Sequence, residues 1–297
     1  MLKRMLGGLL AVAGACATFA APAQEEQDNG ARALVEQLHF KEGEIDVPQA
    51  HARFHLQKDF RYLEQADARK VLEDLWGNPP DTAVLGLIVP KKPDLLDDAS
   101  WAVVVTYSDE GYVPDEDASK IDYDDLLSEM KQGTKDANAE RKEAGYGAVD
   151  LIGWAVPPRY DASAKKLYWA KELAFEGSPG RTLNYDIRVL GRHGYLSLNA
   201  VAGMSELPQV RTGMQQLLPM TEFKEGSRYA DFNESTDKVA AYGVAALIGG
   251  GLATKAGLFA KLGLLAAKFW KLLLVGVVAI GAGVRKLFAR KENTTVR

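Results

Sequence analysis

The pattern of apolar and polar residues divides the chain into a long mixed region and an almost continuously apolar tail that begins near Val239. Early in the mixed region, residues 51–57 alternate: His51, Arg53 and His55 would lie on one face of a strand and apolar residues on the other. Alternation with a period of two is typical of a half-buried β-strand. The segment 59–63 follows directly, so we expect it to be the partner strand.

Later segments predict more strands and several helices. Apolar residues at helical spacing predict helices within 31–38, 65–75, 122–142 and 205–220. Runs rich in β-branched and aromatic residues predict strands at 83–90, 101–113, 148–158, 165–175, 182–191 and 194–203. Two glycine-containing turns, 177–180 and 191–194, separate the last three strands. Such turns favour sequential antiparallel hairpins.

These elements predict an α+β fold. Strands come in groups with helices between the groups, which favours a mainly antiparallel sheet with helices on one side. We expect residues 24–238 to form one domain, because neither half carries a linker of disordered composition.

The N-terminus has the layout of a secretory signal peptide. Lys3 and Arg4 precede an apolar run, and Ala21-Pro22-Ala23 provides small residues for cleavage, so residues 1–23 are predicted to be removed on export. Cys16, the sole cysteine, lies inside this segment, so the mature chain has no thiol. A lipoprotein signal with Cys16 as the lipidated residue is the alternative. It lacks the usual large aliphatic residue three positions earlier.

Charge is distributed unevenly along the chain. Between Gln24 and Lys238 there are 25 Lys/Arg and 39 Asp/Glu, a net charge of −14, whereas residues 239–297 contain nine Lys/Arg and one acid. A domain this acidic has no electrostatic footprint for nucleic acid and is repelled by anionic lipid. The basic residues belong to the tail.

The tail is predicted to be a membrane anchor. Residues 239–259 are long enough for one span, residues 260–271 form a basic amphipathic stretch, and residues 272–288 could return as a second, shorter span. Residues 289–297 are a basic tail. Lysines favour the cytoplasmic side, so a single span places the acidic domain in the periplasm, at the bacterial inner membrane.

Candidate chemistry is sparse. No catalytic signature sequence occurs, and no cofactor is expected. His51 and His55 are the best metal candidates, and both are weak: on a strand they would lie roughly 13 Å apart, and no third ligand is evident. Arg192 and His193 lie in a hairpin turn, a place where binding residues often occur. An acidic run at 115–125 lacks the spacing of a calcium loop.

The order of several stretches resembles a known family. They are VLEDLWGNPP, YSDEGYVPDEDASKID, GWAVPPRYD, LYWAKEL, LNYDIRVLGRHGYL and RYADFNESTDKVAAYGVAALIGGG. In this order they resemble the DUF2167 family of bacterial membrane-anchored proteins, over about residues 47–288. The resemblance implies an envelope protein with an exported domain and a C-terminal anchor. It implies no activity and no catalytic residue.

Three functions remain open at this point. The favoured one is a binding or scaffolding module with the lipid bilayer and an envelope protein, or a second copy of the chain, as partners. The second is an anchored hydrolase or metal-dependent enzyme. The third makes the tail an oligomerising segment and the exported domain its sensor, because Ala246, Gly250 and Thr254 have the four-residue spacing of small residues that pack membrane helices.

Overall fold

The computed structural model describes residues 21–249, apart from residues 77, 79, 98, 144–146 and 179. It divides into two units, up to Gln37 and from Leu38 onward. The first contains helix α1, Ala21–Glu36. This helix begins earlier than the one predicted within 31–38 and includes the polar residues 24–29, since glutamine and glutamate are good helix formers. Most of the predicted signal peptide lies outside the described residues.

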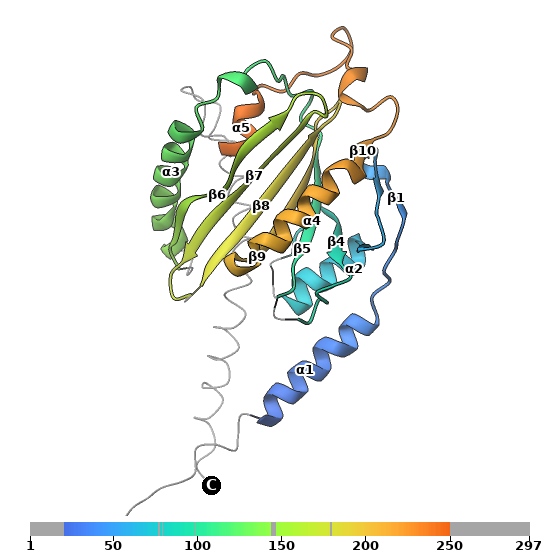
Figure 1. Cartoon of the computed structure of the whole chain (residues 1–297), viewed down its shortest axis with the longest axis vertical. Coiled ribbons are helices and arrows are strands. Elements are labelled where there is room, and N and C mark those ends of the chain that lie inside the picture. The colour runs from blue at the N-terminus through green and yellow to red at the C-terminus, as the bar shows by residue number, and fades with distance from the viewer. Residues whose placement is uncertain are drawn as a thin grey trace, which may run out of the picture. The chain divides into compact units, whose positions relative to one another are not determined.

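A seven-stranded antiparallel sheet organises the second unit, in the order β3-β4-β5-β9-β8-β7-β6 (Figure 1). Its strands are β3 Phe60–Glu64, β4 Val84–Pro90, β5 Ala102–Ser108, β6 Val149–Asp161, β7 Lys166–Phe175, β8 Arg181–Leu190 and β9 Tyr195–Gly203. The predicted run of hairpins from residue 148 to residue 203 is confirmed, because β6, β7, β8 and β9 pair in succession. Strand β9 also pairs with β5, and this pairing joins the later hairpins to strands β3 to β5, which come much earlier in the sequence.

A smaller three-stranded sheet lies beside it, in the order β1-β2-β10. Its strands are β1 Glu44–Val47, β2 Ala52–His55 and β10 Thr221–Phe223. The predicted pairing of 51–57 with 59–63 was wrong. Strand β3 joins the large sheet through β4, and β2 pairs instead with β1 and with β10, more than 160 residues further along the chain.

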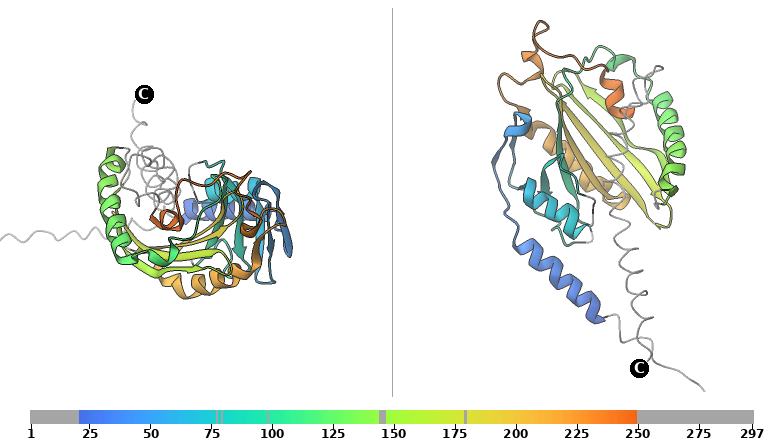
Figure 2. Two further views of the ribbon diagram at one scale, coloured as in Figure 1. Left: turned by 90° about the horizontal axis from the view of Figure 1, so that it is seen from above. Right: turned by 180° about the vertical axis from the view of Figure 1, so that it is seen from behind.

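Helices cover both faces of the large sheet, so the prediction of helices on one side was also wrong (Figure 2). Helix α4, Leu207–Met220, packs on β8 and β9. Helix α3, Tyr123–Glu143, packs on β6, and helix α5, Val244–Gly249, packs against α3 on the opposite side of the sheet from α4. Helix α2, Gln65–Arg69, continues as a π-helix over Lys70–Leu75 and packs on β4.

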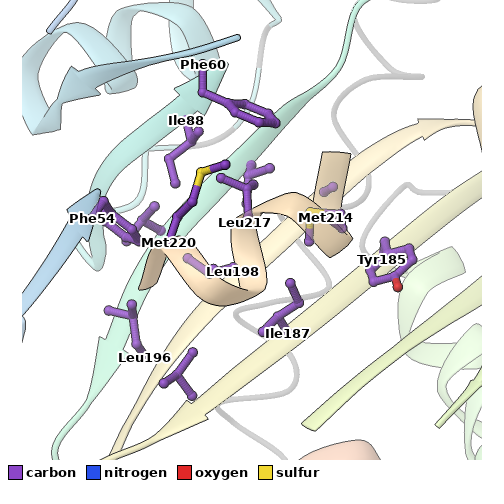
Figure 3. Packing of buried hydrophobic residues seen from close by; sticks show 14 of the residues in the cluster. Phe54, Phe60, Ile88, Tyr185, Ile187, Leu196, Leu198, Met214, Leu217 and Met220 are labelled. Carbon is purple, nitrogen blue, oxygen red and sulfur yellow. The ribbon is translucent and has the colours of Figure 1, made fainter. Parts of the chain in front are cut away.

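The alternation of β8 explains why two cores form. Leu183, Tyr185, Ile187 and Val189 are buried in the first core with α4, which contributes Val210, Met214, Leu217 and Met220. Figure 3 shows Leu217 and Met220 of this helix among Ile88, Ile187 and Leu198 of the strands. The intervening positions of β8 face the other side of the sheet. There the second core joins Trp169, Leu173 and Leu190 to α3 and α5.

The predicted membrane segment is described only as far as Gly249. Val239 forms a bridge with Tyr112, and the helix begins at Val244, so the first five residues of the expected span are not helical. No helix within the described part of the chain is long and apolar enough to cross a membrane. The remainder of the predicted anchor, residues 250–288, and the basic tail lie outside the described residues, so the anchor stays a prediction.

Candidate functional site

The central strands carry a row of polar side chains on the face that α4 does not cover. We call Lys171, Asn184, Asp186, Arg188 and Asn199 the polar strip. The register of the sheet brings them together, because Lys171 pairs with Asn184 and Asp186 pairs with Asn199. Residues directly opposite on neighbouring strands point to the same face.

Asp186 is the centre of the polar strip, and only 3% of its side chain is exposed. Its Oδ1 accepts a hydrogen bond from Asn199 Nδ2 at 2.8 Å and lies 3.0 Å from Arg188 Nη1. Its Oδ2 lies 3.5 Å from Lys171 Nζ. Burial alone would raise the pKa of Asp186, but the two cations outweigh burial and hold this pKa below its ordinary value. The carboxylate is therefore ionised and shared between two positive charges.

The two cations of the polar strip are more accessible than the carboxylate beneath them. The side chains of Lys171 and Arg188 are 19% and 15% exposed. The guanidinium carbon of Arg188 lies 5.1 Å from the ring centre of Trp169 and 5.9 Å from that of Tyr195, within the range of cation–π attraction. Two aromatic rings and one buried carboxylate thus fix the position of this arginine.

A second candidate feature is the start of the apolar tail. We call residues 238–249 the tail root and residues 110–117 the receiving loop. The backbone amide of Tyr112 donates to Lys238 O at 2.8 Å, and the amide of Ala240 donates to Tyr112 O at 2.7 Å. The tail root thereby lies alongside the receiving loop as a parallel bridge.

Side chains complete this junction. The Asp117 carboxylate accepts hydrogen bonds from the amides of Val244 and Ala245, at 3.1 and 3.3 Å, where α5 begins. A carboxylate at this position satisfies amides that have no partner within the helix. The hydroxyl of Tyr242 donates to Glu110 Oε2 at 2.6 Å, and Val244 is fully buried in the second core. The tail root is therefore part of the folded domain.

Asp115 connects the receiving loop to Tyr160 on β6 and to Lys165, which directly precedes β7. Its carboxylate accepts from the hydroxyls of Tyr160 and Tyr229, at 2.6 and 3.1 Å, and pairs with Lys165 Nζ at 2.7 Å. Burial opposes ionisation of Asp115, but these three donors prevail and lower its pKa. The ring of Tyr112 lies between Tyr229 and Phe232, with centroid distances of 4.3 and 3.9 Å. Hydrogen bonds, an ion pair and aromatic contacts thus fix the position of the receiving loop.

The predicted binding turn lies beside this junction. Arg192 forms a bidentate ion pair with Asp237, with Nε–Oδ2 at 2.6 Å and Nη2–Oδ1 at 3.0 Å, and its Nη1 donates to Gly226 O. The guanidinium therefore holds the segment that leads into the tail root. His193 is exposed, and its carbonyl accepts from the Gly111 amide at 3.0 Å. A binding role for the His193 ring stays a prediction.

The two histidines proposed as metal candidates are separated by the local fold. His51 lies before β2 with a left-handed backbone (φ 51°), whereas His55 is on the strand and lies 3.1 Å from Glu222 and 3.7 Å from Glu44. Both side chains are exposed. No group of three or more potential metal ligands occurs among the described residues.

The sequence contained a signal for the polar strip that was missed. Residues 183–189 alternate strictly, with Asn184, Asp186 and Arg188 at every second position. Alternation identifies a strand with one polar face, but it does not show that the strand lies at the centre of a sheet, where that face becomes partly buried. The tail root was missed because its apolar residues suit a membrane as well as a core.

Comparisons with solved structures find distant similarities. One is the solution structure of the cyanobacterial PsbP protein CyanoP from Synechocystis, with 10% identity and a TM-score of 0.35, covering 63% of this chain and 92% of that chain. Another is the Ran-binding protein Mog1p of Saccharomyces cerevisiae, with 7% identity and a TM-score of 0.32, covering 63% of this chain and 96% of that chain. No curated protein matches the sequence.

One family profile matches most of the chain. It covers residues 39–281, described as a protein of unknown function, and so includes the folded domain, the tail root and the apolar residues that follow. Both candidate features lie inside the match. The chain therefore belongs to the DUF2167 family.

Proposed function

We propose that this protein is a membrane-anchored protein of the bacterial envelope whose periplasmic domain binds or scaffolds another envelope component. The domain is held at the inner membrane by the apolar tail. The tail root fixes the orientation of the domain relative to the tail, so the domain presents a defined surface to its partner.

The observation that carries this proposal is the packing of the tail root. Backbone bonds between Tyr112 and residues 238 and 240, together with the Asp117 cap on α5, join the first residues of the tail to the domain. A flexible tether would have a polar, glycine-rich or proline-rich linker at this point. Here the apolar sequence begins within the domain core. The family profile continues to residue 281, which supports the tail as a shared feature of these proteins.

The described carboxyl groups with shifted pKa values belong to ion pairs and hydrogen bonds that stabilise the domain. General acids and bases commonly have pKa values moved toward neutrality by burial or by like charges. In the described part of this chain, every carboxyl group whose pKa departs from its ordinary value is shifted downward, among them Asp67, Asp115, Asp186 and Asp237. Hydrogen-bond donors and cations cause these shifts, and such pairs stabilise structure.

Fractionation of cells tests the proposal. The full chain is compared with a chain that ends after Gly249, which keeps the tail root and removes the rest of the apolar segment. We expect the full chain in the inner-membrane fraction and the shortened chain, still folded, in the periplasmic fraction. Photo-crosslinking from surface positions of the domain should capture a partner only with the full chain.

Two results would count against the proposal. One is extraction of the full chain from membranes by high salt alone, since an anchor of this length requires detergent. The other is protection of the domain from protease added to the periplasmic side of spheroplasts. A reporter enzyme fused after Arg297 separates one span from two, because it is active outside the inner membrane only if the chain returns.

A further inference from the structure

The polar strip has more positive charge than its own carboxylate can balance. Lys171 and Arg188 both lie against Asp186, so two cations share one anion. The described residues place no second carboxylate against either of them. The strip therefore has an excess positive charge inside a domain whose residues 24–238 sum to −14.

Both cations also have unused hydrogen-bond donors. The ammonium of Lys171 makes no hydrogen bond within the described part of the chain and forms an ion pair with Asp186 at 3.5 Å. Arg188 Nη1 donates to Ile187 O at 3.2 Å, while Nε and Nη2 have no acceptor among the described residues. These donors belong to side chains that are 19% and 15% exposed, so a bound acceptor can reach them in place of water.

Neighbouring buried atoms give independent support. Trp169 is 1% exposed and lies opposite Asp186 in the sheet register, yet its indole Nε1 has no partner. Asp186 Oδ2 likewise accepts no hydrogen bond. Buried polar groups in folded proteins are normally satisfied. The unsatisfied indole donor beside the unused cationic donors indicates a place where an oxyanion or an ordered water completes the network, whereas the acceptor Asp186 Oδ2 has the Lys171 ammonium at 3.5 Å.

We propose that the polar strip is a binding site for an oxyanion, a phosphate or carboxylate group, held by Lys171 and Arg188. Asp186 forms the floor of the site and keeps the two cations in place instead of contacting the ligand. Asn199 holds the Asp186 carboxylate through its 2.8 Å hydrogen bond. Charge-assisted bonds from a guanidinium and an ammonium are the strongest that side chains offer to such a group.

The site uses other residues than the anchor proposed above, although Trp169 shares the second core with Val244 of the tail root. It lies on strands β7 to β9, whereas the tail root contacts the receiving loop. The ligand group could belong to a free metabolite or to an envelope polymer or lipid headgroup. These sources share the same oxyanion chemistry, so the test uses small probes first and then vesicles.

Isothermal titration of the full chain in neutral detergent at low ionic strength tests the site. Inorganic phosphate and succinate are the probes, and the variants are Lys171→Gln, Arg188→Gln and Arg188→Lys. Arg181→Gln is the matched control, because Arg181 lies on the same strand as Arg188 but is 48% exposed and pairs with Glu172. Thermal unfolding of every variant shows whether it is folded.

We expect saturable binding of at least one probe. Each glutamine variant should weaken this binding by about tenfold or more, the equivalent of one charge-assisted bond, whereas Arg181→Gln should not change it. Arg188→Lys should retain part of the affinity. Competition by phosphatidylglycerol vesicles would assign the group to a headgroup, and no competition would assign it to a soluble ligand.

Absence of saturable binding by the wild-type chain to both probes would overturn the inference. Equal affinities of wild type, Lys171→Gln and Arg188→Gln would overturn it as well, since binding would then occur elsewhere. Should a glutamine variant fail to fold, Arg188→Lys and Lys171→Arg decide: an unchanged affinity in both refutes the assignment of these two side chains.

Discussion

Replacing Gly111 by alanine should loosen the tail root. Gly111 has a positive φ of 118°, and a Cβ atom there would lie 2.6 Å from Lys238 O and 3.0 Å from Ala240 N. Both neighbours are backbone atoms, so no flexible side chain can move aside. The alanine methyl group therefore forces the receiving loop and the tail root apart.

The cost of Gly111→Ala has two parts. The unfavourable backbone conformation costs about 1–2 kcal/mol. The two backbone hydrogen bonds of the bridge, at 2.8 and 2.7 Å, contribute about 0.5–1.5 kcal/mol each and would be lost. We therefore expect the free energy of unfolding to fall by about 2–5 kcal/mol in total.

Urea unfolding of the full chain in detergent, followed by near-ultraviolet circular dichroism, measures this change. Gly177→Ala is the matched control, because Gly177 also has a positive φ, 81°, but a Cβ atom there meets nothing within 4 Å. The control should cost only the conformational part, about 1–2 kcal/mol. Equal losses in the two variants would refute the reasoning, because the junction would then contribute nothing.

Three further predictions concern the fold. Leu217→Ala in the first core, where the side chain is fully buried, should cost about 2–5 kcal/mol in urea unfolding, whereas Leu96→Ala, at a residue 41% exposed, should cost under about 0.5 kcal/mol. Lys166→Met should cost about 1–3 kcal/mol, because the ammonium donates to Thr221 O at 2.8 Å and to Leu218 O at the end of α4; a cost near zero in the same assay would contradict this role. Burial opposes ionisation of Asp67, but a lysine and a backbone amide outweigh it and lower its pKa from 3.8 to about 2, so its stabilisation is complete above pH of about 4 and is lost as the pH falls toward 2. Asp67→Asn should make unfolding less dependent on pH in that window, and an unchanged slope would show that the ion pair does not form.

Local patterns predicted most of the secondary structure. The strand predicted at 83–90 is confirmed by β4, and the hairpins predicted from 148 to 203 are confirmed by β6 to β9. The helix predicted within 122–142 is confirmed by α3, where the Asp122 carboxylate accepts hydrogen bonds from the amides of Asp124 and Asp125 at 3.0 Å. These features depend on residues close together in the sequence, so the sequence displays them directly.

Long-range pairing could not be predicted in the same way. Residues 52–55 pair with 221–223, and the choice between that partner and the nearer segment 59–63 depends on which faces must be buried. Apolar residues from 239 onward fit a bilayer and a protein core equally well by composition. The bridge to Tyr112, the cap by Asp117 and the burial of Val244 in the second core distinguish the two for the tail root. The polar strip could not be predicted for a related reason, because an ion pair and a hydrogen bond join residues 171, 186 and 199, which lie on three strands.

Hydrogen exchange of the full-length chain in membranes tests the central claim most directly. The amides of Tyr112, Ala240 and Val244 form the junction between the domain and its tail, as they donate to Lys238 O, Tyr112 O and the Asp117 carboxylate. If the tail root is part of the folded domain, these amides should be protected as strongly as those of the central strands β8 and β9. Exchange of Ala240 and Val244 at the rate of an unstructured peptide, with β8 and β9 still protected, would contradict the account.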